Sequence, residues 1–551
     1  MPKIRKKWDF WMVATIVIAA VFILFLIYPL LSLFISGFQD PETGAFTLNH
    51  FARFFEKKYY YQALLHSLAV GTCVTVFATI IGSAIAYMMS FYKIRGSSAL
   101  EILIIITMLS PPFIGAQSWI TLLGRNGVIT SFFRNALGIN FPSIYGFGGI
   151  VLVMTLKLVP FIYLYVTGAL KKVDASLVEA SLSLGCGTFR NIYRIILPLV
   201  TPTLLAGSLL VFMNAMGDFG TPRLIGEGYA VLPVVIYTEF IGEVGGTANF
   251  SAALATILVV VTITLFALQK YVVNRKSFTM SSMRPIQAND PHGVRGVLMH
   301  VFIYLEILLG LLPQITVTVT SFMPTQGTRF MKGFTFEHYI QIFDDMGRAI
   351  TNTLLFGLTA IAMIVLLGVF ISYISVRRRN TVSSFIDMST MFPYILPGSV
   401  LGITLLMAFN DYPLMLSGTA FIMILSYVIR RLPYTLRSST AILYQISPSM
   451  EEASISLGCP PVKTFFKITA VMMMPGVFSG AIMSWITIIN ELSSSLILYT
   501  GNTRTMSVSI YTQVLRGSYG PASAMATVLT VFTVVSLMIS FKLSGRRTVD
   551  I

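Results

Sequence analysis

The residues from 10 to 38 form a run without a single charged side chain, and other long apolar runs follow along the chain. A helix needs about 20 mainly apolar residues to cross a hydrocarbon layer roughly 30 Å thick. With 55% hydrophobic and only 11% charged residues, the chain is too apolar for a soluble globule. We therefore predict an all-α, polytopic membrane protein.

We predict six membrane-spanning helices in each half of the 551-residue chain. The predicted spans are 10–38, 62–92, 102–124, 146–170, 195–222 and 247–269, then 296–322, 349–376, 388–410, 414–440, 468–499 and 517–541. The first run is too long for the apolar region of a signal peptide, so we expect it to be retained as a helix. An even number of crossings places both termini on the same side of the membrane.

The net charge of +16 comes from Lys and Arg residues that cluster in the short connections between the apolar runs. Connections on the side of the termini carry more than twice as many of these residues as connections on the other side. Cytoplasmic loops are enriched in Lys and Arg, so we predict that both termini are cytoplasmic. This distribution also argues against nucleic-acid binding, which needs a continuous basic surface.

A seven-residue segment occurs twice: residues 179–185 read Glu-Ala-Ser-Leu-Ser-Leu-Gly, and residues 452–458 read Glu-Ala-Ser-Ile-Ser-Leu-Gly. The same spacing of 273 residues relates other pairs of positions: Pro160 and Pro433, Cys186 and Cys459, Gly207 and Gly480, and Asp218 and Glu491. Two parallel six-helix repeats explain this pattern. We place the first repeat at residues 1–273, a cytoplasmic linker at 274–294 and the second repeat at 295–551.

Both copies of the segment lie in predicted cytoplasmic loops. Their Ala and Ser residues are small and permit close approach to another surface, and Glu179 and Glu452 supply a charge there. Gly185 and Gly458 can adopt the left-handed conformation that ends a short helix. An ordinary helix–turn–helix connection would explain one copy, but two copies in register favour a duplicated docking surface.

The residues Glu179-Ala180-Ser181-x3-Gly185-x9-Ile195-x-Leu197-Pro198 resemble the EAA motif of binding-protein-dependent ABC importer permeases. The motif loops cover residues 172–197 and 445–470. The second copy keeps Glu452-Ala453-Ser454, Gly458 and Ile468, but has Ala470-Val471 in place of Leu-Pro. We expect this change to alter the start of the eleventh span, and so expect that the two loops need not couple equally. Each half resembles one type I permease subunit.

The resemblance implies that each loop forms a coupling helix on a cytoplasmic ABC ATPase, with two ATPase copies per complex. The residues implied in this docking are Glu179, Ala180, Ser181, Gly185, Glu452, Ala453, Ser454 and Gly458. ATP and Mg²⁺ are then expected in the ATPase, because this sequence contains no Gly-x4-Gly-Lys-Ser/Thr loop. An extracytoplasmic substrate-binding protein and a prokaryotic inner membrane are also implied. We expect no catalytic residue and no cofactor in this chain.

Charged residues inside predicted spans, together with the asparagines that flank two of them, are candidates for a translocation path, because isolated charges in a membrane are costly. The candidates are Lys157, Asn214, Asp218, Arg430, Arg431, Asn490 and Glu491. The alternative is structural: cations paired with carboxylates inside each half, or side chains that reach toward the headgroups.

Three segments, Gly217–Pro222, Arg431–Tyr434 and Asn490–Ser493, resemble fused permeases of the ferric-iron importer branch. Ferric iron is therefore the expected substrate. The same branch includes carriers of phosphonates, sugar phosphates, polyamines and thiamine, and the duplicated cations suit a phosphate, a phosphonate or iron carried with an anion.

Two other classes of membrane protein fit the sequence less well. An ion-driven secondary transporter would not need paired coupling loops. A membrane enzyme would need clustered polar groups, but the five His residues are scattered, and the three Cys residues lack the spacing of a metal site or a disulfide framework.

Overall fold

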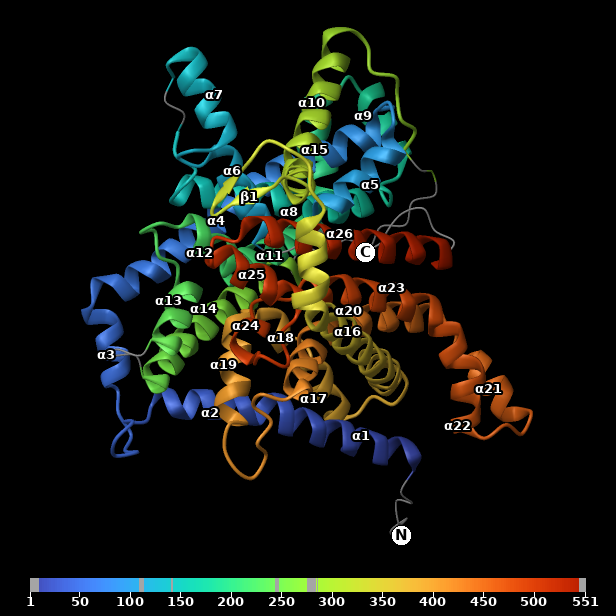
Figure 1. The fold of residues 1–551 in the computed structure, drawn as a ribbon. Coiled ribbons are helices and arrows are strands. Elements are labelled where there is room, and N and C mark those ends of the chain that lie inside the picture. The colour runs from blue at the N-terminus through green and yellow to red at the C-terminus, as the bar shows by residue number, and fades with distance from the viewer. Residues whose placement is uncertain are drawn as a thin grey trace, which may run out of the picture.

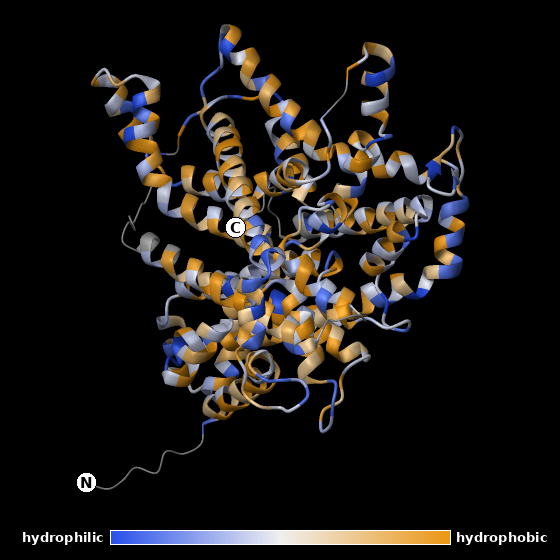
Figure 2. Ribbon diagram, turned by 90° about the vertical axis from the view of Figure 1, so that its left-hand side faces the viewer, coloured by the Kyte–Doolittle hydropathy of each residue, from blue (hydrophilic) through white to orange (hydrophobic). Residues whose placement is uncertain are grey.

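A computed structural model describes residues 9–108, 113–139, 142–242, 247–274, 284 and 286–544. Within this part of the chain, helices account for nearly all regular structure, and hydrophobic residues cover the long helices (Figure 2). Two short antiparallel strands, β1 (Thr325–Gln326) and β2 (Arg329–Phe330), form a hairpin. The predicted all-α fold is confirmed. The basic N-terminus and residues 275–283 and 285 of the predicted linker lie outside the described residues.

The first half contains a series of long helices separated by short ones (Figure 1). They are α1 (Phe10–Phe22), η1 (Ile23–Ile27), α2 (Tyr28–Gly37), α3 (Asn49–Glu56), α4 (Lys58–Phe91), α5 (Ser97–Met108), α6 (Ile114–Leu123), α7 (Val128–Leu137), α8 (Phe147–Leu170), α9 (Ala175–Ser183), α10 (Thr188–Asn191), η2 (Ile192–Ile196), α11 (Leu197–Gly217), α12 (Gly220–Ile225), α13 (Leu232–Ile241) and α14 (Ala248–Asn274). The segments η1 and η2 are single π-helical turns inside longer helices.

The second half repeats this order with one long helix in place of α3 and α4. Its helices are α15 (Gly293–Ser321), α16 (Glu337–Arg377), α17 (Thr381–Ser389), α18 (Phe392–Ile395), α19 (Gly398–Ala408), α20 (Ala420–Gln445), α21 (Ser449–Ser456), α22 (Pro461–Thr464), η3 (Phe465–Thr469), α23 (Ala470–Ile489), α24 (Ser495–Leu498), α25 (Met506–Leu515) and α26 (Tyr519–Ser544).

Nine helices in the described part of the chain are long and apolar enough to cross a membrane. The tenth predicted span corresponds to α20, which is long but carries several Arg residues. The predicted spans 102–124 and 388–410 are not single helices. The first is divided into α5 and α6, on either side of residues 109–112, and the second into α17, α18 and α19. Pro397 explains one break, because proline disfavours helical geometry in the residue before it, and Leu396 is extended.

The predicted spans 195–222 and 468–499 extend too far. Helix α11 ends at Gly217 and α23 ends at Ile489, and each is followed by a short helix and then by a ten-residue helix, α13 or α25. Asp218 and Glu491 therefore lie at breaks after a helix, rather than inside one as we predicted. The physical reason is the local hydrogen bonding of these carboxylates, which is described with the site below.

The core of each half is a three-helix unit, α4–α8–α11 in the first and α16–α20–α23 in the second. Glycines permit the closest contacts. A Cβ atom on Gly82 would lie 2.8 Å from the Cβ of Ile162, and one on Gly357 would lie 2.9 Å from the Trp485 ring. Gly71 packs against Phe212 just as Gly357 packs against Trp485. Similar helix packing in both halves supports the internal repeat.

The first helix of each half packs on the other half. Helix α2 contacts α19, and α1 contacts α16 and α17, as Figure 1 shows for the blue helices at its lower edge. In turn, α15 packs on α5 and α6, where the Ser118 hydroxyl donates a hydrogen bond to the Pro313 carbonyl over 3.0 Å. The two halves are thus interlocked by an exchange of helices.

Trp11 anchors one side of this exchange. It is 2% exposed, and its ring centroid lies 4.4 Å from that of Tyr373 and 4.8 Å from that of Phe465. We predict that Trp11→Ala lowers the free energy of unfolding by about 3–5 kcal/mol, because it leaves a cavity in the contact between the halves. Thermal unfolding of the purified protein would measure this change. Met12→Ala is the matched control, because Met12 is exposed on the same helix; equal stability losses in the two variants would contradict the prediction.

Candidate functional site

A polar cavity of about 200 Å³ lies between the two halves. Its walls come from α8, α11 and the α11–α12 connection in the first half, and from α20, α23 and the residues after α23 in the second. All seven translocation-path candidates line it: Lys157, Asn214, Asp218, Arg430, Arg431, Asn490 and Glu491. The structure therefore brings together residues that are up to 334 positions apart in the sequence.

In the first half, one ion pair crosses from α8 to the end of α11. Lys157 Nζ lies 3.1 Å from Asp218 Oδ2. The other carboxylate oxygen, Oδ1, accepts a hydrogen bond from the backbone N–H of Thr221 over 2.9 Å. Asp218 thereby satisfies a free N–H at the start of α12, as a capping residue does, which stabilises the break between the two helices.

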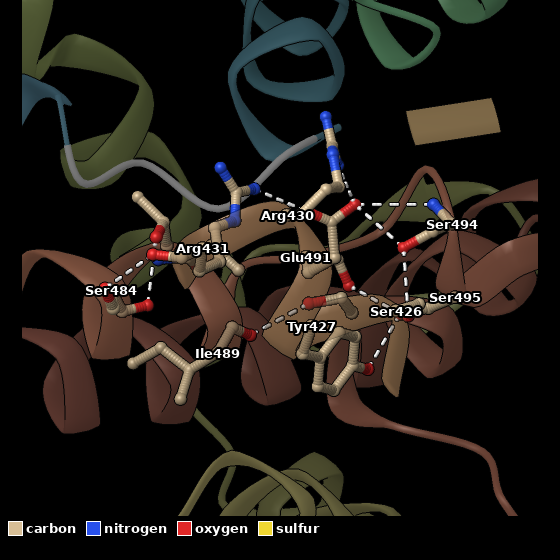
Figure 3. Close-up of polar contacts among 12 residues, drawn as sticks. Ser426, Tyr427, Arg430, Arg431, Ser484, Ile489, Glu491, Ser494 and Ser495 are labelled. Atoms are coloured by element: carbon tan, nitrogen blue, oxygen red, sulfur yellow. Dashed lines mark hydrogen bonds and ion pairs between the residues drawn. The ribbon is translucent and has the colours of Figure 1, made fainter. Parts of the chain in front are cut away.

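In the second half, two cations share one carboxylate. Arg430 and Arg431 on α20 donate to the two oxygens of Glu491, as Figure 3 shows. The Glu491 side chain is only 2% exposed. Its Oε1 also accepts from the backbone N–H of Ser494 over 3.3 Å and from the Ser494 hydroxyl over 3.4 Å. Thr221 and Ser494 are equivalent under the repeat, so the carboxylate has the same local role in both halves.

The cluster has an excess of positive charge, because three cations face two carboxylates. Pairing within each half, the structural alternative, is observed, and the paired side chains also reach the cavity surface. Asn214 and Asn490 donate to carbonyls one turn earlier, those of Leu210 and Ile486. These two amides are therefore held by their own helices.

The lining also has an aromatic part, which the sequence did not lead us to predict. Phe161 and Tyr434 both border the cavity, and the repeat makes them equivalent positions. Each directly follows the proline, Pro160 or Pro433, that α8 and α20 contain. Their equivalence after a shared proline was the available signal.

A second, more apolar cavity of about 580 Å³ adjoins the first. The two cavities share four lining residues, which are Phe161, Met213, Asn214 and Tyr434. The second extends along α20 past Arg437 to Ile442, toward α21. Arg437 forms an ion pair of 3.2 Å with Asp387. A connected space thus extends from the charged cluster toward the membrane face that carries the repeated Glu-Ala-Ser loops.

The two repeated loops have the same backbone. Helices α9 and α21 carry the Glu-Ala-Ser segments and lie at the periphery of the helical body (Figure 1). Gly185 and Gly458 have φ values of +79° and +87°, the left-handed conformation that we predicted. In each loop the N–H of the following Cys donates to the carbonyl of the buried Ser, Ser181 or Ser454. This 6→1 bond, together with the bond from the glycine N–H, is a Schellman motif that ends the helix.

Each loop presents an exposed apolar surface of equivalent residues. Leu184 is 87% exposed and Leu457 is 89% exposed. The other exposed members are Leu177 and Leu182 in the first loop, and Met450 and Ile455 in the second. Exposed apolar side chains in register on two loops are typical of protein contact surfaces.

The missing Leu-Pro of the second loop does not change its helix. A π-helical turn precedes the long helix in both halves, as η2 before α11 and as η3 before α23. Both turns start at the same position of the repeat. Our expectation of an altered start to the eleventh span is therefore wrong. The α-helical geometry does not require proline at the first turn, where proline is merely tolerated.

Among the described residues, the two loops differ instead in the ion-pair partner of their repeated glutamate, Glu179 or Glu452. Glu179 pairs with Arg284 of the linker over 3.1 Å, and the Arg284 carbonyl accepts from the Ala175 N–H. Glu452 is exposed and makes no ion pair in the part of the chain that the structure describes. The neighbouring Glu451 pairs with Arg377 over 3.2 Å. Among the described linker residues, Arg284 contacts the first of the two loops.

Metal-binding clusters are not found among the described residues, where no three His, Cys, Asp or Glu side chains gather in a suitable way. His50 and His338, which follow the similar segments Phe46-Thr47 and Phe334-Thr335 at the same spacing, instead face backbone carbonyls, those of Gln39 and Met323, each over 3.1 Å. Each His is the second residue of its helix, α3 or α16, and these contacts fit a packing role.

A family model described as "binding-protein-dependent transport system inner membrane component" matches residues 78–278 and 364–549. The chain belongs to this family. The two matches account for more than half of the sequence and fall once in each half. The chain is therefore a multi-pass inner-membrane permease built from two repeats.

Several named proteins resemble the permease. It is 29% identical to the ferric transport system permease protein FbpB of Actinobacillus pleuropneumoniae, over 92% of this chain and 74% of that one. It is 28% identical to the putative ferric transport system permease protein FbpB 1 of Haemophilus influenzae, over 91% and 80%. It is also 28% identical to the spermidine/putrescine transport system permease protein PotC of Escherichia coli, over 46% and 91%.

Among solved structures, the permease is similar to a bacterial ABC transporter involved in the import of the acidic polysaccharide alginate. The sequence identity is 18%, the TM-score is 0.42, and the match covers 49% of this chain and 96% of the other.

Proposed function

We propose that this permease forms the membrane pathway of an ATP-driven importer for ferric iron. The proposed substrate rests on the similarity to two ferric transport permeases over about nine tenths of the chain. The polyamine permease matches 46% of this chain and 91% of its own length, at 28% identity. Two repeats, at residues 1–273 and 295–551, each supply half of the pathway and one docking loop.

The charged cavity suits iron that crosses together with an anionic ligand. Fe³⁺ alone would be repelled by Lys157, Arg430 and Arg431, whereas an anion beside the metal would be attracted by them. Asp218 and Glu491 hold these cations in place when the cavity is empty. Cargo would then compete with the carboxylates for the cations, so that binding is reversible, as transport requires.

Two copies of a cytoplasmic ABC ATPase dock on α9 and α21 in this proposal, with ATP and Mg²⁺ bound by the ATPase. The exposed leucines supply apolar contact, and Glu179 and Glu452 supply charge. Closure of the ATPases would draw the two loops together and close the apolar cavity that extends toward them. Both termini lie on the ATPase side, and a substrate-binding protein delivers iron from the opposite side.

The test is reconstitution of the permease with its ATPase and binding protein in liposomes that contain ATP on the ATPase side. We expect uptake of radioactive ferric iron that depends on ATP and on the binding protein. Phosphonate, sugar phosphate, spermidine and thiamine should neither be taken up nor compete. ATP-dependent uptake of one of these compounds in place of iron would overturn the substrate and keep the transporter class. Uptake driven by an ion gradient without ATP would overturn both.

Charge reversal at the docking loops should have unequal effects. We predict that Glu452→Lys weakens ATPase binding by about tenfold, whereas Glu179→Lys weakens it less, because Arg284 already shares the Glu179 carboxylate. Titration of the purified permease with ATPase at low and high salt would measure both affinities. Glu42→Lys, in the exposed turn after α2, is the control. Equal losses for the two docking variants would contradict the predicted difference, and no loss in either would contradict the docking site.

A further inference from the structure

An apolar groove of about 790 Å³ lies at the surface of the first half, outside the polar pathway. It is bordered by α4, α8, the η2–α11 segment and α15 of the second half. Its volume is within the roughly 300–1,000 Å³ usual for small-molecule sites. Several of its α15 side chains are exposed: Leu298, Val301, Phe302 and Leu305. These apolar residues belong to a membrane-spanning helix, so the groove is open to the lipid.

The internal repeat shows what fills the equivalent place in the second half. Pro29 of α2 and Pro313 of α15 are equivalent, and the same spacing makes Trp11 equivalent to Arg295. Trp11 is buried there against Phe370, Tyr373 and Phe465, with ring centroids 4.4–6.2 Å apart. An aromatic side chain of the protein thus occupies the equivalent position in the second half.

The first half lacks these filling side chains. Gly82 packs against Ile162, and Gly368 packs against Thr435, the equivalent residue 273 positions later. Gly82 and Gly368 are therefore equivalent. It follows that Ala84 corresponds to Phe370 and Tyr87 corresponds to Tyr373. Ile192 is equivalent to Phe465. Ala84, Tyr87 and Ile192 all line the groove. Smaller side chains therefore replace two phenylalanines, and a cation replaces the tryptophan, so the groove stays open.

Arg295 lies at one end of the groove, two residues after the start of α15. This end is at the membrane face that carries the linker, because Lys93 and Asp290 form an ion pair beside it over 3.1 Å. The Arg295 guanidinium lies 5.9 Å from the centre of the Tyr92 ring. It is exposed and makes no ion pair within the described residues. A cation and a tyrosine at this depth match the headgroup layer of a membrane.

The length of the groove fits one acyl chain. From Arg295 to Leu305 the helix rises by about 15 Å, at roughly 1.5 Å per residue. That distance is half of a hydrocarbon layer about 30 Å thick, and so corresponds to one leaflet. We propose that this groove binds an anionic phospholipid, with an acyl chain along α15 and the phosphate group at Arg295. A free phosphate would use only the mouth and would leave the apolar length unexplained.

The experiment uses the whole permease with its ATPase, purified and incubated with mixed phosphatidylglycerol and phosphatidylcholine. Native mass spectrometry counts the lipids that stay bound. We expect preferential retention of phosphatidylglycerol. Arg295→Gln should lower this preference by about fivefold, the effect of one cation near an anionic headgroup. The double variant Ala84→Phe, Arg295→Trp, which copies the second half, should abolish retention at this site.

Val297→Trp is the matched control, because Val297 is exposed on α15 but does not line the groove. It should retain phosphatidylglycerol as the unaltered protein does. Equal retention by the Arg295→Gln variant and the unaltered protein would overturn the proposal, as would equal retention of the two lipids. If the double variant does not fold, the single Arg295→Gln variant still decides the outcome. The result of this lipid-binding test does not depend on whether ferric iron is the transported substrate.

Discussion

Glu491→Gln is expected to abolish transport and to lower the free energy of unfolding by about 3–5 kcal/mol, the usual cost of breaking a buried ion pair. The Glu491 carboxylate contacts both Arg430 and Arg431, and it is nearly inaccessible to solvent. The amide of Gln carries no charge, so both guanidinium groups would lose their ion pair with this carboxylate at once. The helix break that the carboxylate caps would also weaken.

Thermal unfolding and ATP-dependent uptake in liposomes would measure the two effects. Asp218→Asn is the matched control in the first half. It should cost less, because it frees only one cation, and Lys157 is 31% exposed and can be hydrated in the cavity. Equal stability losses for the two variants would show that the burial of the Glu491 cluster has no energetic consequence.

A charge-balanced variant separates stability from transport. Arg430→Gln together with Glu491→Gln restores the original net charge of the cluster. We expect part of the stability to return while transport remains lost, because cargo would find fewer cations. Full recovery of uptake in this double variant would contradict a role of these residues in the pathway.

The second large effect is expected at the coupling surfaces. Leu184→Asp together with Leu457→Asp should prevent stable ATPase binding and remove substrate-stimulated ATP hydrolysis. Both leucines are almost fully exposed in the isolated chain. Burial of one leucine contributes about 1.5–3 kcal/mol, so each substitution should weaken binding by about ten- to a hundredfold.

Co-purification and ATPase assays would measure this loss, while thermal unfolding of the permease should stay unchanged because neither side chain packs in the core. Leu137→Asp is the control. Leu137 is 57% exposed at the end of α7, far in sequence from both loops. Undiminished stimulation of ATP hydrolysis in the double variant would mean that the ATPase docks elsewhere.

Local patterns in the sequence were enough to predict most of the membrane helices, the internal repeat and the left-handed glycine that ends each Glu-Ala-Ser helix. Each of these depends on neighbouring residues: an apolar run is long enough to span, or a glycine stands where a helix must end. The same reasoning failed at the helix breaks after Gly217 and Ile489. At each break a carboxylate, Asp218 or Glu491, follows within two residues, but its effect depends on a cation from another helix that balances its charge.

Which residues meet was decided by the tertiary structure. The sequence alone determined that charges occur in the membrane, but only the fold paired Glu491 with two arginines some 60 positions away. Only the fold exchanged the first helices of the two halves, and only the fold showed that Trp11 fills a groove that Arg295 leaves open. The physical reason is that lipid and neighbouring helices are equally apolar, so hydrophobicity selects the helices but not their partners. Partners are selected by close packing and by the pairing of buried charges, which arise between residues far apart in the chain.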